Sequence, residues 1–106
     1  MQSRKPTLQE QKLLDLLVKK ASGLDLPGTW KKTLLVEPMK DGGMGSIRLL
    51  PCGVGEERRI YGRTVAEHEF IDSDGVTVLA SLNVDQAGDL FEVDIWKTDF
   101  TPLRGS

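Results

Sequence analysis

The C-terminal half of the chain contains three runs in which apolar and polar residues alternate. The runs cover 59–71, 76–85 and 89–96, and a turn signal separates each run from the next. Alternation with a period of two indicates β-strands that bury one face and expose the other. Three such strands joined by short turns predict an antiparallel meander, whose register follows from the geometry of the turns.

The first turn, Asp72-Ser73-Asp74-Gly75, fits a three-residue hairpin loop with Gly75 in the left-handed conformation. Residue 72 then pairs with residue 76, which places Phe70 opposite Val78. On the long strand before this turn, Gly62 predicts a β-bulge, because glycine inside a strand often marks one.

The second turn, 85–88, is expected to place Val84 opposite Phe91, because another pairing would turn one apolar set toward water. The inward face of the meander then contains the apolar side chains of one parity. These are Ala66, Phe70, Val76, Val78, Ala80, Leu82, Val84, Phe91, Val93 and Ile95.

The N-terminal half predicts one helix and two short strands. Thr7 and Glu10 have the spacing of a capping box, and apolar residues recur at helical spacing behind them, which predicts a helix over about 8–22. Short apolar runs closed by prolines predict strands over about 33–37 and 46–50. The helix is too short to be stable alone, so its apolar stripe must pack on the sheet.

These elements predict a single α+β domain over residues 1–106, in which the N-terminal helix packs on a bent five-stranded antiparallel sheet. The alternative is that the bent sheet curls into a partly closed Sm-like or SH3-like barrel. A helix followed by five strands is also the element order of Sm-like domains, a similarity of topology alone.

Composition narrows the class of protein. The net charge of −2 argues against a general nucleic-acid binder, which usually carries a strong basic excess. The apolar runs are too short to cross a bilayer, and no apolar signal region follows the N-terminus. Cys52 is the one cysteine, so no intramolecular disulfide can form. A cytoplasmic protein with no membrane partner is expected.

The predicted register gathers four carboxylates and two apolar side chains on the outward face of the meander. We call this set the acidic face; it consists of Glu67, Glu69, Leu79, Glu92, Asp94 and Trp96. One interpretation is a docking surface for a basic protein partner or a second copy of the chain, with Trp96 as an aromatic anchor. The alternative is an ordinary solvated sheet face, on which residues 100–103 of the same chain cover Trp96.

Two further interpretations use other residues. An Sm-like RNA-binding module would use the basic and aromatic residues of the middle segment, namely Arg48, Arg58, Arg59, Tyr61 and Arg63. A small enzyme would use His68, the one histidine, as its acid or base. His68 is expected to point inward, opposite Ala80, with no nucleophile beside it, so no catalytic residue is assigned. No metal site or cofactor is predicted either, because flat strands spread carboxylates apart.

The C-terminal run resembles the ending of a family of small bacterial proteins of unknown function. Gly88-x-Leu90-Phe91-Glu92-x-Asp94-x-Trp96-Lys97 is followed by Asp99-Phe100-x-Pro102-Leu103, a pattern similar to that of the family. The similarity also takes in Arg4-Lys5-Pro6 and Tyr61-Gly62-Arg63. It implies a bacterial source and supplies no catalytic residue or cofactor. The leading interpretation is therefore a non-enzymatic bacterial binding protein, either an immunity protein or an adaptor.

Overall fold

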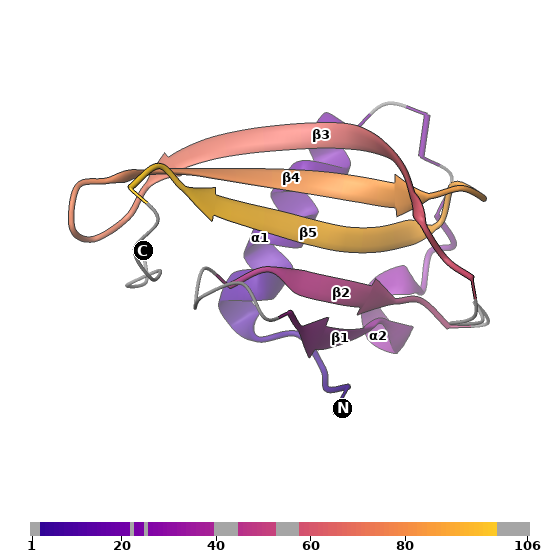
Figure 1. Cartoon of the computed structure of the whole chain (residues 1–106). Helices are drawn as coiled ribbons and strands as arrows, with labels where there is room; N and C mark the ends of the chain where they lie inside the picture. Colours follow the sequence, from indigo (N-terminus) through magenta and orange to yellow (C-terminus); the bar gives the residue numbers. More distant parts are fainter. Residues whose placement is uncertain (1–2, 22, 25, 40–44, 53–57, 100–106) are drawn as a thin grey trace.

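The chain folds into one antiparallel sheet with its helices on one side. The computed structural model describes residues 3–21, 23–24, 26–39, 45–52 and 58–99. The elements are α1 (Leu8–Lys20), α2 (Trp30–Thr33), β1 (Leu35–Pro38), β2 (Ile47–Leu50), β3 (Tyr61–Ile71), β4 (Thr77–Asp85) and β5 (Leu90–Lys97). The five strands lie in the order β1-β2-β5-β4-β3, and α1 crosses one face obliquely (Figure 1). The predicted α+β class is confirmed.

The predicted capping box begins α1. Thr7 Oγ1 accepts a hydrogen bond from the Glu10 amide at 3.2 Å, and Glu10 Oε1 accepts one from the Thr7 amide at 2.9 Å. The Glu10 carboxylate is also bound by both terminal nitrogens of Arg4, at 2.7 and 3.0 Å. The helix ends at Lys20 because Ala21 adopts an extended conformation, two residues before the predicted end.

A short helix that was not predicted, α2, precedes the first strand. The Leu34 amide donates to the Trp30 carbonyl at 3.0 Å, which closes one helical turn. This turn brings Trp30 against the hydrophobic core. The predicted strand over 33–37 therefore begins later, at Leu35, because Thr33 still belongs to the helical turn.

The register of the first hairpin is confirmed. Phe70 pairs with Val78 and Ala66 pairs with Leu82, while Gly75 has a φ of +82° in the left-handed region. The predicted bulge at Gly62 is also present, as a register shift between Tyr61 and Arg63. A short glycine turn and strict alternation are enough to fix this part of the sheet.

The predicted pairing of Val84 with Phe91 is wrong. Val84 lies opposite Leu90, and Asn83 lies opposite Glu92, so Phe91 is the extra residue of a bulge. Leu90 and Phe91 are both buried as a result, at 1% and 4% exposure. Leu90 joins the main core, whereas Phe91 is not among the residues of that cluster.

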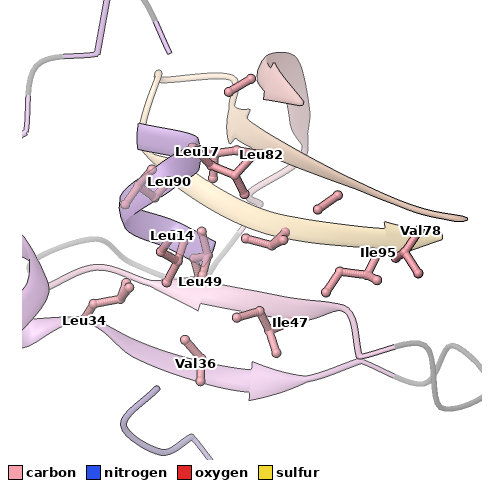
Figure 2. Close-up of a cluster of buried hydrophobic side chains, with 13 residues drawn as sticks. Leu14, Leu17, Leu34, Val36, Ile47, Leu49, Val78, Leu82, Leu90 and Ile95 are labelled. Atoms are coloured by element: carbon pink, nitrogen blue, oxygen red, sulfur yellow. The ribbon is translucent and has the colours of Figure 1, made fainter. Parts of the chain in front are cut away.

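The core lies between α1 and the inward face of the sheet. In Figure 2 the leucines of α1 stand over side chains from β2 and β4. Of the predicted inward residues, Phe70 and Val76 are half-buried near the end of the sheet, and the others are buried. The core cluster consists of Leu14, Leu17, Leu34, Val36, Ile47, Leu49, Ala66, Val78, Ala80, Leu82, Leu90, Val93 and Ile95.

The sheet is open, as the leading prediction has it, and the alternative of a partly closed Sm-like or SH3-like barrel does not apply. β1 and β3 form the opposite edges of the sheet. Arg4 covers the β1 edge through two backbone hydrogen bonds with Val36, at 2.8 and 2.7 Å. At the β3 edge, the Lys20 ammonium donates to the Glu67 carbonyl at 3.4 Å. No helix of the described ranges has the length and apolar character needed to cross a membrane.

Two leucines of β4, Leu79 and Leu82, lie on opposite faces of the sheet and therefore test which face belongs to the core. Leu82 is fully buried, so Leu82→Ala should lower the free energy of unfolding by about 2–5 kcal/mol. Leu79, on the outward face, is half-buried, and Leu79→Ala should cost less than about 1 kcal/mol. Urea unfolding of both variants measures the difference. Equal losses would contradict the assignment of the two faces.

Candidate functional site

The pairing of β3, β4 and β5 brings the acidic face together in two cross-strand rows. Glu69 pairs with Leu79 and Leu79 with Trp96, while Glu67 pairs with Ser81 and Ser81 with Asp94. Directly opposed side chains on such a face lie about 5 Å apart. These are the neighbours that the sequence predicts, on the face that α1 does not cover (Figure 1).

Glu92 belongs to a third row, which extends toward the β1 edge. Asn83 and Arg48 flank it on the neighbouring strands, and Glu37 lies beyond Arg48. The row alternates acidic and basic charges, unlike the other two. Arg48 therefore marks the boundary of the acidic face.

Hydroxyl groups hold two of the carboxylates. Ser46 is buried; its Oγ accepts from the Ile95 amide at 2.8 Å and lies 3.3 Å from Asp94 Oδ1. Ser81 Oγ donates to Glu67 Oε2 at 3.4 Å. Neither contact brings a positive charge to the carboxylate, and each restricts its position.

The electrostatics of the face appear most clearly at Glu92. Burial raises the pKa of the Glu92 carboxyl above its ordinary value of 4.5, and the negative charge of Asp94 raises it further. The Arg48 charge and a hydrogen bond from Asn83 lower that pKa, but they do not offset the increase. The fold therefore makes the charged form of Glu92 less favourable than it is in the unfolded chain, and a nearby cation would reduce this cost.

Trp96 and Leu79 give one end of the face an apolar surface. The Trp96 side chain is 43% exposed, and half-buried Leu79 lies directly opposite on β4. An aromatic ring with carboxylates in the same and the next row suits contact with the aliphatic part and the charged end of a basic side chain. Residues 100–103, considered from sequence as a cover for Trp96, lie outside the described residues.

The arginines proposed for RNA binding do not form one surface. Arg58, Tyr61 and Arg63 are exposed. Arg59 is instead buried, with a side chain only 5% exposed, and its Nε donates to Asp85 Oδ2 at 2.8 Å. Its two terminal nitrogens donate to the carbonyls of Leu49 and Leu90.

Arg48 and Arg59 both lie over the ring of Phe91. The guanidinium carbons are 4.5 and 5.2 Å from the ring centroid. Both arginines thus cover the bulged Phe91 on the outer part of the sheet, and Arg59 serves the fold rather than a ligand. The sequence does not reveal this role, because Arg58 and Arg59 are adjacent residues of the same type and no local pattern shows which of them is buried.

His68 lies opposite Ala80, as predicted, and is half-buried. Its Nδ1 lies 3.1 Å from the Lys20 ammonium, and its ring stacks on Phe70 with centroids 6.3 Å apart. Because an ammonium only donates, Nδ1 is the acceptor and Nε2 carries the hydrogen. Cys52 is exposed and precedes the undescribed residues 53–57. Within the described part of the chain, no three His, Cys, Asp or Glu side chains cluster as metal ligands would.

A buried lysine that sequence reasoning missed fixes one end of the acidic face. Lys97 is fully buried, and its ammonium donates to Asp72 Oδ2 at 2.9 Å and Asp74 Oδ2 at 2.5 Å. Burial works to lower the pKa of Lys97, but the hydrogen bonds that its ammonium donates to Asp74 and Asp72 raise the pKa overall. The end of β5, next to Trp96, is thereby tied to the β3–β4 turn. The two aspartates look like ordinary turn residues in the sequence.

Comparison with known proteins gives the family of the chain but no activity. A model of the family described as Domain of unknown function (DUF6984) matches residues 3–105, so the chain belongs to this family. Membership of a family of unknown function agrees with the resemblance seen in the sequence. No curated protein and no solved structure matches the chain. The C-terminal pattern and the bacterial source stay predictions.

Adjacent arginines test the structural role of Arg59. Arg59→Met should lower the free energy of unfolding by about 3–5 kcal/mol, because it leaves the buried Asp85 carboxylate without its cation. Arg58→Met removes the same charge from an exposed side chain and should change stability by less than about 0.5 kcal/mol. Denaturant unfolding measures both, and similar values would contradict the role given to Arg59.

The raised pKa of Glu92 predicts a pH-dependent gain in stability. Above this pKa, the folded state holds the charge less favourably than the unfolded state does, so Glu92→Gln should increase the free energy of unfolding at pH 7. The gain should disappear as the pH falls below the ordinary value of 4.5, where both states are protonated. Urea unfolding at pH 7 and at about pH 3.5 checks this. A loss of stability at pH 7 would refute it.

Proposed function

We propose that this member of the DUF6984 family is a non-enzymatic binding protein that docks a basic protein partner on its acidic face. The observation that carries the proposal is the placement of Trp96 among carboxylates on the sheet face that α1 leaves open (Figure 1). An immunity protein or an adaptor would use such a surface in the same way, because both bind another protein through complementary shape and charge.

The charges of the face favour a cationic partner. Glu67, Glu69 and Asp94 are exposed on adjacent strands, and Glu92 carries its charge at a cost. Lysine or arginine side chains brought to this surface would lower that cost and would speed association through long-range attraction. Phosphate groups would be repelled by the same carboxylates, which supports a protein partner over RNA.

The apolar end of the face supports an aromatic anchor. Trp96 and Leu79 provide adjoining apolar surface, Glu69 lies in the same row, and Glu67 and Asp94 lie in the next row. Strong protein interfaces concentrate binding energy in a few apolar contacts, among which tryptophan is enriched, next to polar contacts. Lys97 directly follows Trp96 and donates a hydrogen bond to Asp72 in the β3–β4 turn. This bond fixes the strand that carries the anchor.

The alternatives have less support from the described residues. An RNA surface would need the middle arginines on one side, but Arg59 is buried against Asp85 and Arg48 lies between Glu37 and Glu92. An enzyme would need a reactive group beside His68, whereas Lys20 and Phe70 are its observed side-chain contacts. A second copy of the chain is a weaker candidate than a basic protein, because two acidic faces repel each other.

Trp96→Ala separates binding from folding. The full chain, immobilised, is used to capture basic proteins from a lysate of the source organism, and the affinity of the retained partner is then measured. Trp96→Ala should weaken binding by about 2 kcal/mol or more, roughly 30-fold in Kd. Thermal unfolding should change little, because the side chain is 43% exposed. A large loss of stability with unchanged affinity would overturn the proposal.

A matched pair of neutralised carboxylates tests the role of charge. Asp94→Asn lies on the acidic face, whereas Asp15→Asn removes a similar charge on α1, where Asp15 pairs with Lys31 at 2.7 Å. Asp94→Asn should slow association and reduce its dependence on salt, and Asp15→Asn should do neither. Equal effects of the two variants would show that only the net charge of the protein matters.

A further inference from the structure

A groove lies on the opposite side of the sheet from the acidic face, between α1 and the ends of β3 and β5. Its volume is about 610 Å³. It forms because α1 crosses the sheet obliquely and leaves the part next to the β3–β4 turn uncovered (Figure 1). Leu13, Leu16 and Lys12 of α1 line one wall, and the strands contribute His68, Phe70 and Ile95.

The groove has an apolar floor that the core does not fully use. Leu13 and Phe70 are half-buried at the margin of the core. Leu16 is also half-buried, but it belongs neither to the core cluster nor to the side chains packed against it. An apolar group placed in the groove would remove these side chains from water, which is favourable in proportion to the apolar area buried.

Lys12 and His68 place hydrogen-bond donors among the polar side chains that line this floor, which also include Thr7, Gln9 and Glu10. Lys12 contributes an ammonium, and His68 carries its hydrogen on Nε2 because Lys20 occupies Nδ1 at 3.1 Å. Glu10 also lines the groove, but the Arg4 guanidinium pairs with its carboxylate at 2.7 Å and offsets its charge. The charge of the groove therefore suits an anion.

We infer that this groove binds a small amphiphilic carboxylate, with the apolar chain on Leu13, Leu16 and Phe70 and the carboxylate near Lys12. The volume lies within the range of about 300–1,000 Å³ that is typical of small-molecule sites. A stable protein interface uses about 20–30 residues a side, whereas eleven of the described residues line this groove. This inference goes beyond the proposed docking function and uses a different face of the sheet.

Octanoate is a suitable probe, because it has one carboxylate and a short apolar chain. Titration of the full-length protein, followed by amide NMR shifts, should give saturable changes at groove residues such as Leu16 and Phe70. Octan-1-ol, which lacks the charge, and octyltrimethylammonium, which reverses it, should bind more weakly by about tenfold. Equal shifts with all three probes, or no saturable shift with octanoate, would overturn the inference.

Two lysines of the same helix provide the matched variants. Lys12→Gln should weaken octanoate binding by about tenfold, since it removes one charged hydrogen-bond donor from the groove. Lys19→Gln removes the same charge from an exposed residue that does not line the groove, and it should leave the affinity unchanged. Equal losses of octanoate affinity in the two variants would show that only the net charge of the protein matters, and this result would also overturn the inference.

Discussion

The buried ion pair between Arg59 and Asp85 joins the two halves of the sheet. β2 pairs with β5 at only two positions, Ile47 with Val93 and Arg48 with Glu92. Beyond these two positions, the Arg59 guanidinium donates to the carbonyls of Leu49 on β2 and Leu90 on β5. One side chain thus supplies hydrogen bonds to both strands where their backbone pairing has ended.

Asp85 links this joint to the turn between β4 and β5. While Oδ2 accepts from Arg59, Oδ1 accepts from the amides of Ala87 and Asp89 at 2.9 and 3.0 Å. Gly62 passes so close to this residue that a Cβ there would lie 2.3 Å from the Asp85 carbonyl oxygen. The glycine is therefore required by the backbone of the neighbouring strand, which gives the predicted bulge a physical cause.

The sequence predicts the features that local rules determine. The turn at Gly75 and the alternation of β3 and β4 give the first hairpin its register, so the neighbours of Glu67 and Glu69 on β4 can be assigned without a structure. The pairing at Phe91 cannot be assigned from the sequence, because Leu90 and Phe91 are both apolar and either residue could face inward. The burial of Arg59 depends on residues 26 positions away along the chain, and no local pattern distinguishes it from Arg58. The docking role proposed for the acidic face involves contacts with another molecule, which the local rules for strands and turns do not describe.

The two edges of the sheet differ in how they are covered, and this bears on self-association. Arg4 occupies the β1 edge with its backbone and pairs with Glu10 through its side chain, so one residue covers the edge and supports the start of α1. Proteolytic removal of the residues before Pro6 would abolish both contacts together. The backbone groups of Val36 would then be open to a strand of another molecule. Trimming of the N-terminus would therefore convert a protected edge into a template for intermolecular β-sheet growth. The hydrophobic core would stay packed while this happens.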